Sequence, residues 1–119
     1  MNPAALPAPH RLQCHPATPA GLPLDVSAVV NWTRDGLQLR YEVIGNMAGL
    51  RIPVTAAPGP ADGLWQHTCL ETFVAAEGEA AYREFNFSPS GQWAAYRFAA
   101  ERLRDATAAS ALPAPVMQL

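Results

Sequence analysis

The sequence predicts a single all-β domain, a mostly antiparallel β-sandwich. Runs of β-branched and aromatic residues are separated by turns that contain Gly or Pro, and residues 37–43 alternate apolar with polar side chains. A chain of 119 residues fits one core, because folding at this length removes about two-thirds of its surface from water.

Residues 1–24 are rich in Pro and Ala, so we expect a loose arm with at most a short edge strand near Arg11 to His15. The sandwich domain is expected over residues 25–119. Its first run is followed by Asp35-Gly36, a pair typical of hairpin turns. The second run places four apolar side chains on one face and its polar side chains on the other: Leu37, Leu39, Tyr41 and Val43. This pattern predicts a hairpin with one buried face and one solvent-exposed face.

Residues 45–63 form a Gly- and Pro-rich loop, in which Pro53 restricts the apolar piece 50–54 to a sheet edge. Three further strands are expected over 68–75, 82–88 and 93–98.

The link between the last two of these strands favours a three-residue loop in which Ser88 faces Gln92. That register puts four residues on one face, namely Phe85, Phe87, Trp93 and Ala95, and five on the other, namely Tyr82, Glu84, Asn86, Tyr96 and Phe98. A two-residue turn would shift the register by one residue, but it needs Ser90 at a positive φ.

Residues 99–119 suggest a helix and then an open strand. The Ala-rich stretch 99–111 carries charges and predicts a short surface helix. Val116, Met117 and Leu119 begin what resembles another strand, with no turn after it. Because an unpaired strand edge favours association, we expect either a homodimer through this C-terminal edge or a natural protein that continues further.

Composition and charge exclude several classes of partner. The net charge is −2, so no basic field attracts nucleic acid or an anionic membrane surface. No apolar run approaches the roughly 20 residues that cross a bilayer, and the first residues lack the features of a secretory signal. We therefore expect a cytoplasmic protein in which Cys14 and Cys69 remain thiols.

Two segments resemble a known family. The run LWQHTCLETFV (64–74), followed by YREFNFSPSGQWAAYRF (82–98), resembles the bacterial DOMON-like domains, which are similar in turn to family 9 carbohydrate-binding modules. The resemblance implies a jelly-roll-like sandwich of which this chain is about the first two-thirds. It also implies that Trp65 and Glu71 match the Trp and Glu of the first half of a sugar site, whose second aromatic residue would come later.

A sugar site needs a flat aromatic face and polar groups that meet hydroxyls in pairs. The chain offers these types at Trp65, Glu71, Glu84, Asn86 and Arg97. We therefore predict a non-catalytic domain that binds a saccharide or another small polar ligand. The alternative is structural: Trp65 packs a loop onto the sheets, and Glu84 and Arg97 form an ion pair at the rim.

Other site types have weaker support in the sequence, so we expect no catalytic residue, no metal and no cofactor. Haem would need His67 and Met47 as axial ligands, and zinc would need Cys14, His15, His67 and Cys69, whose spacing is unsuitable. A nucleophilic Cys69 with His67 and Glu71 lacks the expected geometry, because residues two apart on a strand are too far apart for a ready hydrogen bond. For a glycosidase pair of Glu71 and Glu84, nothing in the sequence raises the pKa of either carboxyl group. The runner-up is an interaction module whose edge at 116–119 is completed by a partner strand.

Overall fold

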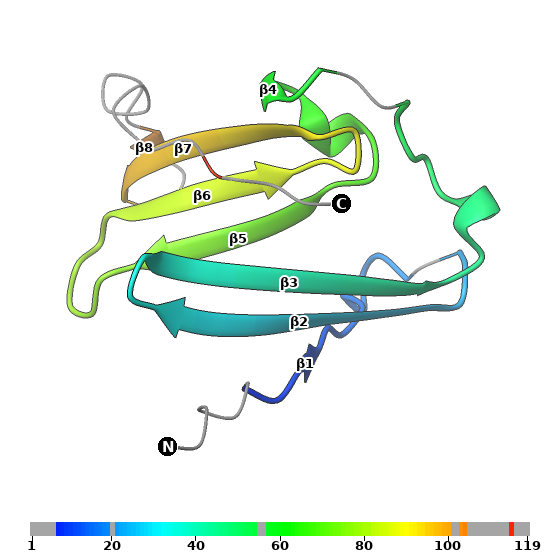
Figure 1. Ribbon diagram of the computed structural model, residues 1–119, viewed down its shortest axis with the longest axis horizontal. Helices are drawn as coiled ribbons and strands as arrows, with labels where there is room; N and C mark the ends of the chain where they lie inside the picture. The colour runs from blue at the N-terminus through cyan, green and yellow to red at the C-terminus, as the bar shows by residue number, and fades with distance from the viewer. Residues whose placement is uncertain (1–6, 20, 55–56, 101–102, 105–114, 116–119) are drawn as a thin grey trace. The chain divides into compact units, whose positions relative to one another are not determined.

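The computed structural model describes residues 7–19, 21–54, 57–100, 103–104 and 115. The chain divides into two compact units, residues 1–50 and 51–119, and each contains one β-sheet (Figure 1). Apart from strands, the described residues form two short 3-10 helices. The predicted all-β class with mostly antiparallel pairing is therefore confirmed. None of the helices in the described residues has the length and apolar character needed to cross a membrane.

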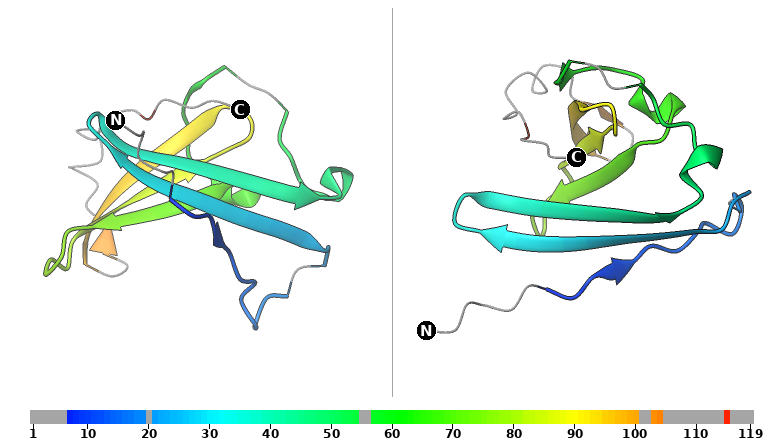
Figure 2. Two further views of the ribbon diagram at one scale, coloured as in Figure 1. Left: turned by 60° about the horizontal axis from the view of Figure 1, so that its bottom comes forward. Right: turned by 45° about the vertical axis from the view of Figure 1, so that its right-hand side comes forward.

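Unit 1 is built on a long hairpin (Figure 2). Its strands are β2 (Leu24–Thr33) and β3 (Gly36–Gly45), which pair from Thr33 opposite Gly36 to Leu24 opposite Gly45. The turn residues are Arg34 and Asp35, one position earlier than the predicted Asp35-Gly36. The Thr33 hydroxyl explains this shift, because it donates to the Gly36 carbonyl at 3.0 Å and accepts from the Asp35 N–H at 3.3 Å.

The hairpin has one apolar and one largely polar face. The apolar pairs are Val26–Val43, Ala28–Tyr41, Val30–Leu39 and Trp32–Leu37, while Ser27–Glu42, Val29–Arg40 and Asn31–Gln38 occupy the other face. Along β3 the side chains alternate between half-buried and exposed, as predicted for residues 37–43.

The edge strand of unit 1 is β1 (His10–Arg11), which pairs antiparallel with β2. The N–H of Leu12 continues this pairing to the Val26 carbonyl at 2.8 Å. The predicted edge strand in the arm is thus present, but it begins earlier and ends before Cys14. A 3-10 helix, η1 (Met47–Gly49), follows β3.

The sheet of unit 2 has the strand order β4-β7-β6-β5, with β8 also paired to β7 (Figure 1). Its strands are β4 (Gly59–Pro60), β5 (Leu70–Ala75), β6 (Tyr82–Phe87), β7 (Gln92–Ala100) and β8 (Leu103–Arg104). Three strands were predicted near these positions, whereas β4 was not. It pairs parallel with β7, and the apolar piece 50–54 forms no strand.

The turn between β6 and β7 has the predicted register. The Ser88 N–H donates to the Gln92 carbonyl at 2.9 Å, and the Gly91 N–H donates to the Ser88 carbonyl at 3.0 Å. Gly91 has a φ of 96°, which a residue with a side chain rarely adopts. The three-residue loop is therefore confirmed, and the alternative two-residue turn is wrong.

This register gives the sheet of unit 2 two different faces. Side chains alternate along each strand, so residues paired across strands share a face. The face that we call the acidic face carries Glu71, Phe73, Ala75, Tyr82, Glu84, Asn86, Ala94, Tyr96 and Phe98. The opposite face, the arginine face, carries Leu70, Thr72, Val74, Arg83, Phe85, Phe87, Trp93, Ala95 and Arg97.

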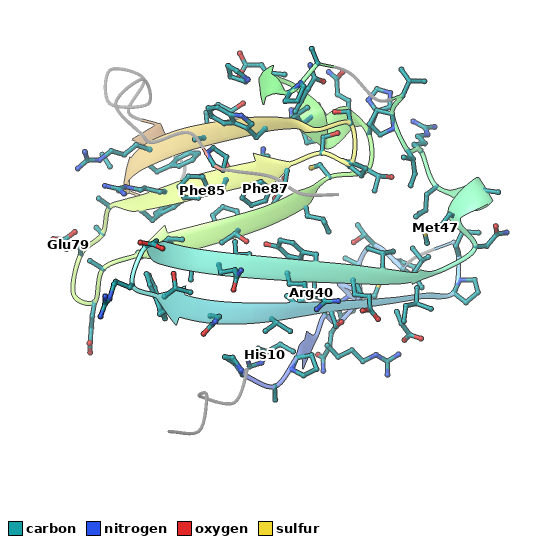
Figure 3. The ribbon with its side chains drawn as sticks, in the orientation of Figure 1. His10, Arg40, Met47, Glu79, Phe85 and Phe87 are labelled. Carbon is teal, nitrogen blue, oxygen red and sulfur yellow. The ribbon has the colours of Figure 1, made fainter. Side chains whose placement is uncertain are left out.

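Aromatic contacts stabilise both faces. On the acidic face the rings of Tyr82 and Phe98 stack at 4.8 Å, and Phe73 meets Tyr82 edge-on at 6.0 Å. On the arginine face Phe85 and Phe87, both on β6 in Figure 3, lie parallel at 6.3 Å. The two pairs on the acidic face join different strands, and such cross-strand pairs stabilise antiparallel sheets by several tenths of a kcal/mol to about 1 kcal/mol each.

The predicted helix over 99–111 is wrong where the structure describes it. Ala99 and Ala100 continue β7, and Leu103 and Arg104 form β8, which pairs with β7 across a bulge. Sheet hydrogen bonds prevail because a short isolated helix is marginal even with Ala. The rest of this stretch, and the predicted strand at 116–119, lie outside the described residues.

Candidate functional site

Three of the five predicted site residues lie together on the acidic face of unit 2. Glu71 on β5 is directly opposite Asn86 on β6, and Glu84 precedes Asn86 by two positions on the same strand. Opposed residues in an antiparallel pair have Cβ atoms about 5 Å apart, and diagonal neighbours about 7–8 Å apart. Two carboxylates and one amide therefore form a compact triangle of polar groups.

Asn86 is the buried member of this triangle. Asn86 is 3% exposed, and its Oδ1 atom has no hydrogen-bond partner among the residues that the structure describes. A buried carbonyl oxygen without a partner costs about 1–3 kcal/mol relative to its hydrated state. Such an atom calls for an explanation, and one explanation is a ligand that donates a hydrogen bond to it.

Cys69, just before β5, extends the acidic face. Its thiol lies 3.9 Å from Oε1 of Glu71 and donates to it. Burial raises the pKa of Cys69 above 9.0, and the charges of Glu71 and Glu84 raise it further, together with the hydrogen bond. The thiolate is therefore disfavoured near neutral pH, which is the opposite of what a nucleophilic cysteine needs. The shift also indicates that both glutamates act on the same small region.

A segment between β4 and β5 crosses the sheet. Because β4 lies beyond β7 and β5 lies beyond β6, this connection must pass over both inner strands. The Tyr96 hydroxyl, on the acidic face, donates to Oδ1 of Asp62 at 2.7 Å, and we infer that the segment crosses on that face. Its 3-10 helix, η2 (Leu64–Gln66), packs against β6 and β7 (Figure 1).

Trp65 is carried by η2. Leu64 is buried at 9% exposure, whereas the neighbouring Trp65 is 69% exposed. One residue of η2 thus anchors the segment, and the next presents its ring to solvent. Because η2 contacts β6 and β7, we infer that Trp65 lies near the face that this segment crosses. Trp65 is consequently available as a stacking platform and does not serve as the buried anchor that the structural alternative requires.

Arg97 is not part of this group. It pairs with Arg83, so it lies on the arginine face and is exposed. Strand alternation therefore separates it from Glu84, and the alternative ion pair between them is not formed. The sequence predicts this separation of Arg97 from Glu84, because a register with Ser88 opposite Gln92 places Arg97 opposite Arg83.

The hydrogen bond from Tyr96 to Asp62 had no signal in the sequence. The two residues are 34 positions apart, and the contact depends on the parallel pairing of β4 with β7. Only the folded chain shows that this bond attaches the crossing segment to the acidic face.

No family model, curated protein or solved structure matches this chain. The resemblance to DOMON-like domains therefore stays a prediction. What the chain can bind has to be argued from the chemistry of the acidic face.

The residues of the haem and zinc hypotheses are divided between the two units. Met47 lies on η1 of unit 1 (Figure 3), and His67 is an exposed residue of unit 2. In the part of the chain that the structure describes, no group of three or more His, Cys, Asp or Glu is placed to hold a metal.

Cys14 and His15, the N-terminal pair of the zinc hypothesis, form hydrogen bonds within their own loop. Cys14 Sγ donates to the Thr18 carbonyl at 3.2 Å, and His15 Nδ1 accepts from the Ala17 N–H at 3.0 Å. Both side chains therefore have a local role, because they stabilise the turn at residues 14–18.

Proposed function

We propose that this chain is a non-catalytic binding domain for a small polar ligand of the saccharide type. The observation that carries the proposal is the buried Oδ1 atom of Asn86, which has no partner and lies beside two glutamates on one face of a sheet. Ligand hydroxyls would supply the missing donor and would meet the carboxylates in pairs.

Trp65 supports the same class of ligand. A sugar ring presents a face of C–H groups, which packs well on an exposed indole, while its hydroxyls point sideways to polar groups. Trp65 is 69% exposed, and its segment is attached to the acidic face through the hydrogen bond from Tyr96 to Asp62. The resemblance to family 9 carbohydrate-binding modules assigns Trp65 and Glu71 to a sugar site and so favours the same proposal.

Calorimetric titration of the purified chain against a panel of neutral and charged mono- and disaccharides tests this function. We expect at least one sugar to bind, with the affinity lost in Trp65→Ala and Asn86→Ala. Arg97→Ala is the matched control, because Arg97 lies on the arginine face and should leave binding unchanged. If no sugar gives heat, or if Arg97→Ala abolishes binding while Asn86→Ala does not, the proposal is refuted.

A second function, as an interaction module, is favoured by a separate observation. β5 is at the end of the strand order, pairs with β6 alone among the described strands, and carries Phe73 at 60% exposure. A six-residue edge strand without Pro or charge clusters is suited to pairing with another chain.

Sedimentation of the chain tests the interaction module. A dimer that Phe73→Lys converts to a monomer would support pairing along β5, because a lysine on an edge strand opposes strand addition. A chain that is monomeric at every concentration would exclude self-association through this edge.

A further inference from the structure

We propose that Arg83 and Arg97 form a binding site for the phosphate group of a small phosphate monoester. The two residues lie directly opposite each other on the inner strands β6 and β7. Both are exposed, and both belong to the arginine face, on the other side of the sheet from Asn86. The inference therefore goes beyond the proposed saccharide site and does not depend on it.

Two positive charges face each other across this strand pair. Opposed residues in an antiparallel pair have Cβ atoms about 5 Å apart, and like charges at this spacing destabilise a sheet. The pairing of Arg83 with Arg97 is therefore unfavourable as a purely structural element. Positions at which a sequence breaks a local rule of this kind are expected at functional sites, where a ligand supplies the compensating interaction. An anion held between the two arginines would convert their repulsion into attraction.

Neither arginine has a counter-ion among the described residues. Arg83 and Arg97 take part in no ion pair and no side-chain hydrogen bond there. The other residues that β5, β6 and β7 place on the arginine face are uncharged. Glu77 and Glu79, in the turn that leads into β6 (Figure 3), form no ion pair with either arginine. Both guanidinium groups are therefore available to an anion from solution.

A phosphate monoester matches this pair in charge and in the number of acceptors. Each guanidinium group presents five N–H donors in a rigid fork and stays charged. A carboxylate has two oxygens and one charge, so a single fork satisfies it. A phosphate monoester carries a charge of about −1.5 to −2 at pH 7 and three acceptor oxygens, so two guanidinium groups can share it. Two facing arginines thus favour a phosphate over a carboxylate.

The surroundings of the pair favour a small organic ester. Val74 lies opposite Arg83, and Phe85 follows Arg83 by two positions on the same face; both are half-buried. Beside apolar side chains a charged pair attracts more strongly than in bulk water, and these side chains also offer contacts to the organic part of an ester. The net charge of the chain is −2, so no extended basic field is present for a polyanion such as a nucleic acid.

Thermal unfolding of the full chain in a buffer without oxyanions tests the repulsion. Arg83→Gln and Arg97→Gln should each raise the melting temperature by about 1–4 °C, because either substitution removes one of the two like charges. Arg40→Gln is the matched control, because Arg40 is an exposed arginine of unit 1 that lies opposite Val29 (Figure 3) and should not raise the melting temperature. A lower melting temperature for both variants would overturn the proposal, since the pair would then stabilise the sheet.

A nuclear magnetic resonance titration of the full chain, followed by the Nε–H signals of the arginines, tests the ligand. We expect methyl phosphate to shift the signals of Arg83 and Arg97 to saturation and to bind at least about tenfold more tightly than acetate. Arg83→Gln and Arg97→Gln should each weaken the binding of methyl phosphate by at least about tenfold, since each removes a charge-assisted contact. Arg40→Gln should leave it unchanged.

Three outcomes of the titration would count against the site. Shifts of Arg83 and Arg97 that do not saturate would mean general ion screening and would overturn it. Acetate that binds as tightly as methyl phosphate would overturn the assignment to a phosphate group. Inorganic phosphate that binds more tightly than methyl phosphate would overturn the ester and assign the site to the free ion. None of these results bears on the saccharide proposal, because Glu71 and Asn86 lie on the acidic face.

Discussion

Replacing Asn86 with leucine should stabilise the protein. Asn86 is 3% exposed, and its Oδ1 atom is buried without a partner. Removing such an atom recovers about 1–3 kcal/mol, and leucine, which is similar in size, adds apolar burial at the same site. Imperfect fit of the branched side chain offsets part of the gain by roughly 1 kcal/mol. We expect a net increase in the free energy of unfolding of about 1–2 kcal/mol.

Urea denaturation followed by tryptophan fluorescence measures this change. With a slope of about 1.5 kcal/mol per molar urea for a chain of this size, the midpoint should rise by about 1 M. Asn31→Leu is the control, because Asn31 is half-buried on the polar face of the hairpin and has no orphan oxygen. That variant should not raise the midpoint.

A lower midpoint for Asn86→Leu would refute the reasoning, because it would mean that the Asn86 oxygen is satisfied in solution. The same substitution should abolish ligand binding. Stabilisation combined with loss of binding is the expected signature of a polar residue that is kept for function.

The remaining predictions concern the acidic face, the crossing segment and one turn. Glu71→Gln should lower the pKa of Cys69 and so speed its alkylation at pH 8, measured by peptide mapping; an unchanged rate would contradict the electrostatic account. Tyr96→Phe should destabilise the chain by about 0.5–1.5 kcal/mol and speed amide exchange between β4 and β5 rather than elsewhere. Gly91→Ala should cost about 1–2 kcal/mol because of its positive φ, whereas Gly21→Ala, with open space around it, should cost less than about 0.5 kcal/mol in thermal unfolding.

Local patterns were sufficient where neighbouring residues decide the structure. The alternation over residues 37–43 predicted the two faces of β3, because a pleated strand sends successive side chains to opposite sides. The link from Ser88 to Gln92 predicted its turn, since a Gly at the last loop position permits the positive φ that this turn needs. The same register predicted that Tyr96 lies on the face of Glu84 and Asn86.

Local propensity failed where distant segments compete. The Ala-rich stretch after Phe98 favours helix by composition, yet Ala99 and Ala100 extend β7, and Leu103 and Arg104 form β8. Hydrogen bonds to an existing strand outweigh the small helical preference of alanine, which amounts to a few tenths of a kcal/mol per residue.

By itself, the sequence determined the all-β class, the two hairpins and the chemical types available for a site, because these depend on periods of two and on turn residues. Only the tertiary structure decided which of these candidate site residues lie close together in space. The parallel pairing of β4 with β7 and the bond from Tyr96 to Asp62 attach the segment that contains Trp65 to the acidic face, whereas the strand register places Arg97 on the opposite face. The burial that leaves the Asn86 oxygen without a partner is likewise a property of packed strands, since no run of residues encodes the absence of a hydrogen bond.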